Sequence, residues 1–294
     1  MMRRRAATET FGSLFGWSIG DRGNLARMNT ADYARRIRRL AVDMVAAANA
    51  SHIGGALSMA DVLAVLYADI VTIKPDEPAW PKRDRVILSK GHCCTAMYAA
   101  LALRGFFPEA ELADYGKDGS RLMAHISHGV PGVELSTGSL GHGLPVGVGR
   151  ALAGKRGGCQ WRVFVVMSDG ELDEGSNWES FLFAPQHGLD NLVAIIDYNK
   201  IQSLGRVDDV IALEPLAAKL ASFRWSVREV DGHDHAAIKR SLETLPWEAG
   251  RPSCLIAHTV KGKGVDFMED SLDWHYKSPR GPLHEEARRQ LEGP

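Results

Sequence analysis

Two short, wholly apolar runs constrain the fold of this chain more than any other feature. Val163–Met167 and Leu192–Ile196 are rich in β-branched residues and contain no polar position. Such runs are typical of strands buried on both faces of a parallel sheet. The first run ends in Ser168-Asp169-Gly170 and the second in Asp197-Tyr198-Asn199. Because ligands bind beyond the carboxyl ends of parallel strands, we expect a polar site at these two endings.

The residues at the two strand ends suit a divalent cation and a phosphate group. Asp169 and Asn199 each offer a side-chain oxygen, which is the ligand type that hard cations take. Gly170 allows the backbone to approach a phosphate closely. Asp169-Gly170 alone would also be ordinary turn chemistry, and the matching Asn199 favours the metal interpretation. The sequence therefore predicts a site for a magnesium-bound diphosphate.

Strand and helix patterns alternate along the rest of the chain. Further strands are predicted over residues 85–88, 226–230 and 253–257, and helices over 30–50, 93–104, 144–154, 177–187, 216–222 and 236–245. No linker-like change of composition divides the chain. We therefore expect one α/β domain over residues 29–276, a doubly wound, mostly parallel sheet flanked by helices. Residues 1–28 are interpreted as an N-terminal arm and residues 277–294 as a polar C-terminal tail.

Composition excludes several classes of protein. The net charge of −1 argues against a nucleic-acid-binding or membrane-surface protein. No apolar stretch approaches the ~18 residues that a membrane span needs, and no apolar signal core follows the basic start. The four cysteines lack CxxC spacing, which is typical of thiols in a reducing compartment. The expected location is the cytoplasm.

Histidines lie in glycine-rich loops and at strand ends. His52, His92 and His275 sit in short loops, and His125 lies in the long loop of residues 118–143. Loops of that length inside a compact domain are usually functional, and histidine is the side chain most easily tuned for proton transfer near neutral pH. We expect these four to act together. A functional and a structural role remain equally open for His142, whereas His128 and His187 are interpreted as structural.

Six loops, in order, resemble those of transketolases, a family of thiamine diphosphate enzymes. The matching stretches are residues 51–55, 89–92, 131–134, 137–143, the Ser-Asp-Gly and Asp-Tyr-Asn pair, and 258–264 continued by 274–275. The resemblance covers about residues 30 to 276. It implies the diphosphate-binding domain of the thiamine diphosphate-binding fold. Thirty residues from Asp169 to Asn199 leave room for one crossover helix between adjacent strands.

The resemblance also implies roles for single residues. The metal ligands would be Asp169, Asn199 and the carbonyl of Ile201, holding Mg²⁺ or alternatively Ca²⁺ or Mn²⁺. Catalytic roles fall to His52, His125 and His275. The residues that would contact the cofactor, or link two cofactor sites in the case of Glu174, are His92, Gly138, Leu140, Gly170, Glu174, Asn199 and His275.

Full transketolases resemble this chain only over their first part. In them a second domain binds the aminopyrimidine of the cofactor and supplies the glutamate that activates it. The chain thus resembles the first subunit of a split transketolase, a transferase that moves a two-carbon ketol unit between sugars or sugar phosphates. The implied partner is a separate C-terminal subunit with the pyrimidine-binding domain, in an α2β2 assembly.

Three alternatives remain open from the sequence. After His125 the family usually has proline and an acidic residue, whereas this chain has Ile126-Ser127. This change leaves room for a pyruvate-type donor, with decarboxylation and acyl transfer. A second alternative is a subunit that binds cofactor poorly and assembles or regulates its partner. A nicotinamide-binding protein is the fold-level competitor, but no GxGxxG follows the first strand.

Four charged residues near the matching loops have plainer interpretations. Glu171 and Asp173 are expected to be solvated charges at a helix start. Lys261 and Lys263 either hold their loop to an anionic group or are simply exposed.

Overall fold

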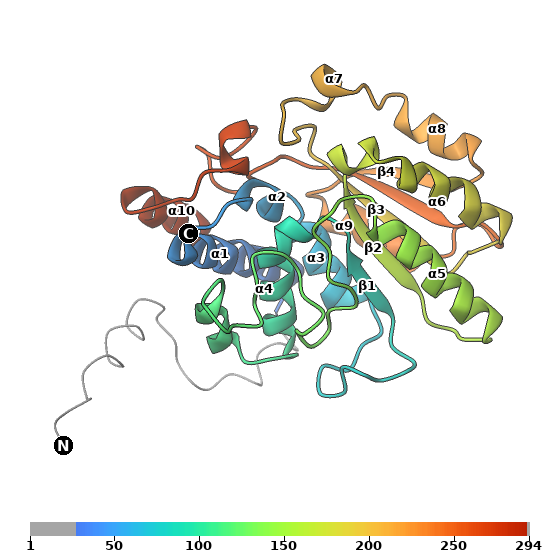
Figure 1. Ribbon diagram of the computed structural model, residues 1–294, viewed down its shortest axis with the longest axis horizontal. Helices are drawn as coiled ribbons and strands as arrows, with labels where there is room; N and C mark the ends of the chain where they lie inside the picture. Colours follow the sequence, from blue (N-terminus) through green and yellow to red (C-terminus); the bar gives the residue numbers. More distant parts are fainter. Residues whose placement is uncertain (1–27, 293–294) are drawn as a thin grey trace.

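Helices and parallel strands alternate along residues 28–292, the part of the chain described in this computed structural model (Figure 1). The predicted N-terminal arm lies outside the described residues except for Met28. The named elements, apart from short 3-10 and π turns, are α1 Thr30–Ala48, α2 Ile53–Ser58, α3 Ala60–Val65, β1 Arg85–Leu88, α4 Cys94–Arg104, α5 Gly143–Arg156, β2 Val163–Ser168, α6 Gly175–Gln186, β3 Leu192–Tyr198, α7 Val207–Val210, α8 Leu216–Ser222, β4 Ser226–Asp231, α9 His235–Glu243, β5 Ser253–His258 and α10 Pro282–Glu292.

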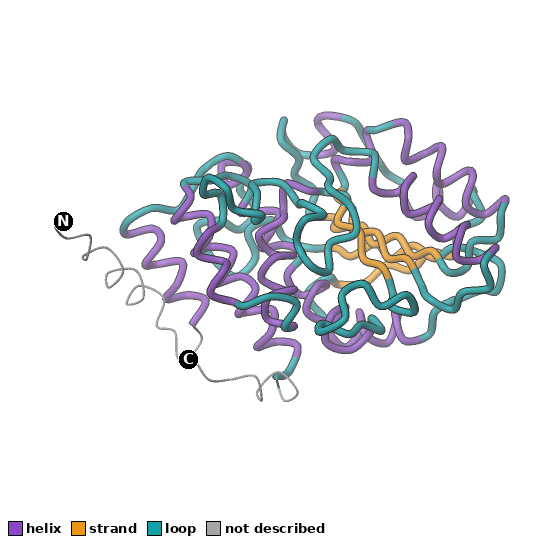
Figure 2. The backbone as a smooth tube through the Cα atoms, turned by 60° about the horizontal axis from the view of Figure 1, so that its bottom comes forward, coloured by secondary structure: helices purple, strands orange, loops and turns teal. Residues whose placement is uncertain are grey.

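The five strands form one sheet in the order β1-β2-β3-β5-β4, and each neighbouring pair is parallel. In Figure 2 the strands lie between helices on both sides. The predicted doubly wound parallel sheet is confirmed. The register pairs Ser168 of β2 with Asp197 of β3, which sets the polar residues after the two strands beside each other.

Alternate residues of the central strands enter two different cores. In β2, Phe164 and Val166 face a layer built from α1, α3, α4, α9 and α10. Val163, Val165 and Met167 face the opposite layer, formed by α5, α6 and α8. Side chains of a strand alternate between the faces of the sheet, so a strand covered on both faces must be apolar throughout. This is the physical origin of the two apolar runs.

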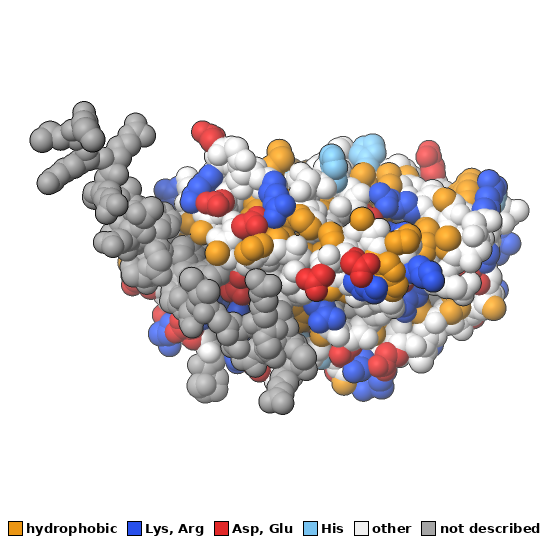
Figure 3. All heavy atoms as spheres, turned by 90° about the horizontal axis from the view of Figure 1, so that it is seen from below, with side chains coloured by type: hydrophobic (Ala, Val, Ile, Leu, Met, Phe, Trp, Pro, Cys, Tyr) orange, Lys and Arg blue, Asp and Glu red, His pale blue; other side chains and the backbone are white. Residues whose placement is uncertain are grey.

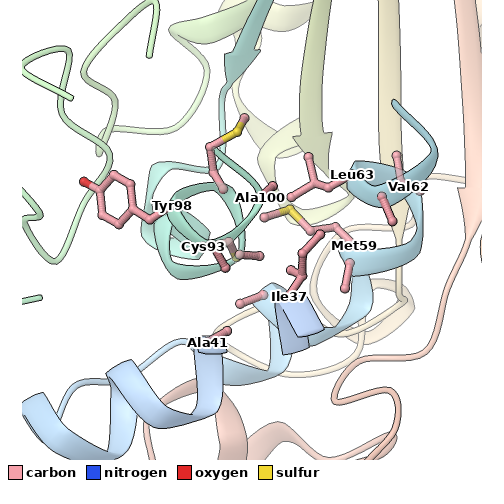
Figure 4. Packing of buried hydrophobic residues seen from close by; sticks show 14 of the residues in the cluster. Ile37, Ala41, Met59, Val62, Leu63, Cys93, Tyr98 and Ala100 are labelled. Carbon is pink, nitrogen blue, oxygen red and sulfur yellow. The ribbon is translucent and has the colours of Figure 1, made fainter. Parts of the chain in front are cut away.

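The first layer depends on close packing of small residues (Figure 4). Ile37 and Ala41 of α1 lie against α3 and α4, where Leu63 and Ala100 are fully buried. Fully buried alanines along α4 let neighbouring helices approach closely. The layer holds α4 in place, and the amino end of α4 follows the loop that carries His92.

The prediction of a polar C-terminal tail is wrong for residues 282–292, which are helical. They form α10, which buries Ala287 and Leu291 in the first layer. His284 Nε2 lies 2.7 Å from Oδ1 of Asp43 on α1, which ties the two helices together. The helix was missed because only one narrow stripe of it is apolar, and the rest of its surface is charged.

The surface viewed from below in Figure 3 carries acidic and basic side chains interspersed with small apolar groups. This mixture agrees with the near-zero net charge of −1. Among residues 28–292, no helix combines the length and the apolar character needed to cross a membrane.

Candidate active site

Loops that follow four neighbouring strands meet at one edge of the sheet. Ser89–His92 follows β1, Asp169 follows β2, Asn199 follows β3 and Thr259–Lys261 follows β5. Because all four strands are parallel and adjacent, their carboxyl ends share this edge. The site is therefore built from segments about 170 residues apart in sequence that the sheet brings together.

Asp169 and Asn199 lie next to each other, as predicted. The Asp169 carboxylate is buried, and it accepts hydrogen bonds from Gly170 N at 2.7 Å and Lys200 N at 2.5 Å. The bond to Lys200 joins the residue after β2 directly to the residue after Asn199. Burial, reinforced by the nearby charge of Asp197, raises the pKa of Asp169 to about 7. A bound cation would favour the ionised carboxylate.

A buried ion pair beneath the site was missed from the sequence. Asp197 and Lys90 are each 1% exposed, and their side chains form a salt bridge. Asp197 Oδ2 also accepts from Ser58 Oγ at 2.6 Å and from Asn199 Nδ2 at 3.1 Å. Burial alone would raise the pKa of Asp197, but the Lys90 ammonium holds it below its usual value. Because its amide nitrogen is held by Asp197, Asn199 keeps its carbonyl oxygen in a fixed orientation.

The oxygen donors fit a cation held jointly with a diphosphate. Asp169, Asn199 and the Ile201 carbonyl supply the hard oxygen ligands that Mg²⁺ takes. Within residues 28–292, no group of three or more His, Cys, Asp or Glu could hold a metal ion by itself. A cation here would therefore need oxygens from its ligand or water. A Cβ at Gly170 would lie 2.6 Å from Cβ of Gln202, so the turn has no room for a larger residue.

The side chain of Lys261, from the loop after β5, extends to the same oxygen donors. Its buried Nζ donates to the Ile201 carbonyl at 2.8 Å and to Nδ1 of His275 at 3.0 Å. Burial lowers the pKa of Lys261 to about 8. The exposed interpretation is therefore wrong for Lys261. Lys263 is half-buried and pairs with Glu269 at 3.3 Å.

The four predicted histidines form one cluster centred on His52. The ring centroid of His52 lies 5.1 Å from that of His92, 5.9 Å from His125 and 5.0 Å from His275. His52 adopts a left-handed backbone conformation, φ 71°, and its N–H donates to the carbonyl of His275 at 2.8 Å. Four separate loops thus place imidazoles around one point.

Three of the four imidazoles, those of His52, His92 and His275, have lowered pKa values. Burial, with His125 and Lys261 as further causes, lowers the pKa of His52 to about 4. Burial and the charge of Lys261 lower the pKa of His275 to about 3. The pKa of His92 is also held well below its usual value by burial and Lys90. A neutral imidazole donates through one ring nitrogen and accepts at the other, so these three rings can hydrogen-bond to hydroxyl and carbonyl oxygens.

The loop of residues 137–143 borders this cluster. A Cβ at Gly138 would lie 3.5 Å from Cδ2 of His125. Leu140, two residues further along the chain, is half-buried. His142 is exposed, as is Glu174 at the start of α6. Gly138 thus lies beside the histidine cluster, and Glu174 is exposed in the described chain.

Glu171 contradicts the expectation of a solvated charge. Its side chain is fully buried and accepts hydrogen bonds from the Ser89 hydroxyl and from Gly141 N at 3.0 Å. Burial raises the pKa of Glu171. Asp173 is half-buried and accepts from Gln202 Nε2 at 3.1 Å. Acidic residues are common in the first turn of a helix, so the local sequence carries no sign that this one is enclosed.

Comparison with known proteins identifies related chains. The family described as "Transketolase, thiamine diphosphate binding domain" matches residues 29–291. An apulose-4-phosphate transketolase subunit of Phocaeicola vulgatus is 42% identical over 254 residues, covering 86% of this chain and 90% of that protein. The 6-deoxy-6-sulfo-D-fructose transketolase subunit of a Clostridium species is 39% identical over 260 residues, covering 88% and 94%.

Transketolases are also found among the solved structures that this chain resembles in fold. The crystal structure of transketolase from Campylobacter jejuni superposes with a TM-score of 0.85 at 30% identity. The match covers 90% of this chain and 43% of that one, so this chain spans less than half of that transketolase.

Proposed function

This chain belongs to the transketolase family, and on that premise we propose that it is the diphosphate- and metal-binding subunit of a two-chain transketolase. The observation that carries the proposal is the paired ending of β2 and β3, where Asp169 accepts from Lys200 N and the side chain of Asn199 donates to Asp197. Mg²⁺ would be held by Asp169, Asn199 and the carbonyl of Ile201. Gly170 and His92 would contact the diphosphate, with the cation of Lys261 nearby.

The residues of the chain suit transfer of a two-carbon ketol unit. Thiamine diphosphate, when bound, supplies the carbanion chemistry, and the protein supplies binding, orientation and electrostatics. Breaking a carbon–carbon bond beside a carbonyl needs protons to move to and from hydroxyl and carbonyl oxygens. We assign those transfers to His52, His125 and His275, since a well-placed acid–base group is worth typically ~10²–10⁴-fold in rate. Gly138 and Leu140 would line the thiamine part of the cofactor.

A partner chain would complete the site. Two relatives aligned over 90% and 94% of their length carry names that call them transketolase subunits. We therefore assign the pyrimidine-binding domain and the activating glutamate to a separate chain, in an α2β2 assembly. Glu174, exposed at the start of α6, would face the partner and link two cofactor sites. Leu182 on the same helix, 63% exposed, is available to the same interface.

The donor would be a ketose or ketose phosphate, and the acceptor an aldose or its phosphate. Relatives named for apulose-4-phosphate and for 6-deoxy-6-sulfo-D-fructose differ in the sugar they act on. The residues after His125, Ile126-Ser127, depart from the family's usual proline and acidic residue. Donor preference is therefore the property in which we expect this enzyme to differ from standard transketolases.

The test is calorimetric titration of thiamine diphosphate into the full chain mixed with its partner subunit. We expect binding that requires Mg²⁺ and that Asp169→Ala weakens by at least about tenfold, since even residues behind the metal ligands contribute that much. Asp76→Ala, at an exposed position in the loop before β1, is the control and should bind like the unaltered protein. Equal binding with and without Mg²⁺, or unchanged binding by Asp169→Ala, would overturn the proposal.

A further inference from the structure

We propose that Glu171 is a positioning residue that clamps the loop of residues 137–143 into the shape needed to hold the thiamine part of the cofactor. The inference rests on the proposed function, which brings that cofactor to the adjacent site. Glu171 would act through the loop, without touching the cofactor itself.

Glu171 joins three segments that are far apart in sequence. Its Oε1 accepts from the hydroxyl of Ser89, after β1, and from Gly141 N at 3.0 Å. Its Oε2 accepts from Ser168 N, at the end of β2, at 3.4 Å. Burying a carboxyl group is unfavourable unless its oxygens are hydrogen-bonded, and here both are. The side chain is therefore fixed by its surroundings and fixes them in return.

The peptide of Gly141 is held from its other side as well. Its carbonyl accepts from Ser176 Oγ at 2.6 Å. Gly141 has φ 82°, and a Cβ there would lie 2.6 Å from Ser176 Oγ and 2.7 Å from Cβ of Glu174. Gly141 is thus hydrogen-bonded to Glu171 on one side and to Ser176 of α6 on the other. These two bonds fix the position of the loop at Gly141.

Ser89 extends the clamp to the end of the loop. Its Oγ accepts from Gly143 N at 3.1 Å while its hydroxyl hydrogen is donated to Glu171. At the other end of the loop, Thr137 Oγ1 donates to the carbonyl of Leu88 at 2.6 Å. Both ends of the loop are therefore fastened to the carboxyl end of β1, and its middle is fastened to Glu171.

The fastened loop presents Gly138 to the histidine cluster. Gly138 lies against the ring of His125, which is 5.9 Å from the ring of His52. Asp169 and Asn199, which would hold the diphosphate, make their hydrogen bonds to residues outside this loop. The bond from Ser168 N, beside Asp169, is the longest that Glu171 accepts, at 3.4 Å, so the clamp should govern mainly the contacts to the thiamine part and disturb the diphosphate anchor little.

Two probes separate these contributions in the full chain mixed with its partner: thiamine diphosphate and inorganic pyrophosphate, each with Mg²⁺. For Glu171→Ala we expect the Kd for thiamine diphosphate to rise by at least about tenfold, the range seen when supporting residues are removed. The Kd for pyrophosphate should stay within about twofold, because pyrophosphate lacks the thiamine part that the loop would contact. Ser89→Ala should show the same pattern with a smaller loss, and it carries the test if Glu171→Ala fails to fold.

Further variants distinguish positioning from simple stabilisation. Glu171→Gln keeps an oxygen acceptor for Gly141 N and should recover part of the affinity for thiamine diphosphate. Glu77→Ala, at an exposed position, should leave both constants unchanged. Equal losses for both probes, or no loss for either, would overturn the clamp. If the unaltered protein bound neither probe, the proposed function would fail and the clamp with it.

Discussion

Asp197 shows how one buried residue can serve both stability and the site. It neutralises Lys90, accepts from Ser58 and Thr259, and orients the amide of Asn199. Breaking a buried ion pair by removing one partner leaves an uncompensated charge, whereas replacing both partners by apolar groups is often tolerated. The ion pair can therefore be tested separately from Asn199, the proposed metal ligand that it orients.

Asp197→Asn is expected to lower the free energy of unfolding by about 3–5 kcal/mol, because the Lys90 ammonium is left buried and unpaired. Adding Lys90→Met should restore part of that loss. The restored protein should still bind Mg²⁺ and thiamine diphosphate poorly, since Asn199 no longer has its carboxylate partner. Urea unfolding and calorimetry measure the two effects. If Asp197→Asn alone changes the free energy of unfolding by less than about 1 kcal/mol, the ion pair contributes little to stability.

The histidine cluster should make the cofactor-free protein sensitive to acid. The pKa of His52 is about 4 in the folded chain, against an ordinary value of 6.5. Below about pH 6.5 the unfolded chain binds a proton that folded His52 does not, so stability is full above that pH and falls towards pH 4. The groups facing His52 are His92, His125, His275, Tyr276, Ser51 and Lys261.

His52→Gln should therefore lose less stability than the unaltered protein between about pH 7 and pH 4.5. Urea unfolding at several pH values within that window gives the comparison. His142→Gln, at an exposed position, should follow the unaltered protein. Parallel curves for His52→Gln and the unaltered protein would mean that the pKa of His52 is not depressed in the folded state.

The sequence predicted the site residues that lie in loops, but it did not predict the buried ion pair below those loops. Asp169, Asn199 and the four histidines were found because strand endings and glycine-rich loops mark them. Asp197 and Lys90 were missed, since a charged residue beside an apolar run gives no sign of its partner. Their pairing joins β3 to the loop after β1 across 107 residues, and only the folded sheet brings them together.

At the level of elements, α5 depends on glycines for its approach to the sheet. A Cβ at Gly147 would lie 2.6 Å from Cγ2 of Val165 on β2. At Gly149, in the same helix, a Cβ would have nothing within 4 Å. The two positions differ in packing but share their helical context, so they form a matched pair.

Gly147→Ala should destabilise the protein by about 1–3 kcal/mol, as expected when a tight core is overpacked. Gly149→Ala should stabilise it by up to about 1 kcal/mol, because alanine is the better helix former. Thermal and urea unfolding of the two variants check both signs. Similar changes in the two variants would show that α5 can move away from β2 without cost.

Strands were predicted closely because burial on both faces makes them apolar throughout. Predicted strands over 85–88 and 253–257 match β1 and β5 to within one residue. Helix α10 was missed because its contact with α1 uses one stripe, and its polar surface resembles a solvated tail. A helix that covers the outside of a layer leaves a weaker pattern than a strand at its centre.

At the scale of the whole molecule, the sheet brings the loops of the candidate active site to one edge. The loops after β1, β2, β3 and β5 supply His92, Lys90, Lys261 and the oxygen donors described above. This chain spans less than half the length of the full-length transketolase described above. We propose that the remaining functions, including activation of the cofactor, come from the partner chain.

Reconstitution tests this account most directly. The chain and its partner are assayed separately and mixed, with Mg²⁺, thiamine diphosphate, a ketose phosphate donor and an aldose phosphate acceptor. We predict that ketol transfer appears only in the mixture and is lost when Asp169→Ala replaces the unaltered chain. Transfer by this chain alone, or release of CO₂ from pyruvate by a mixture that forms no ketol product, would contradict the account.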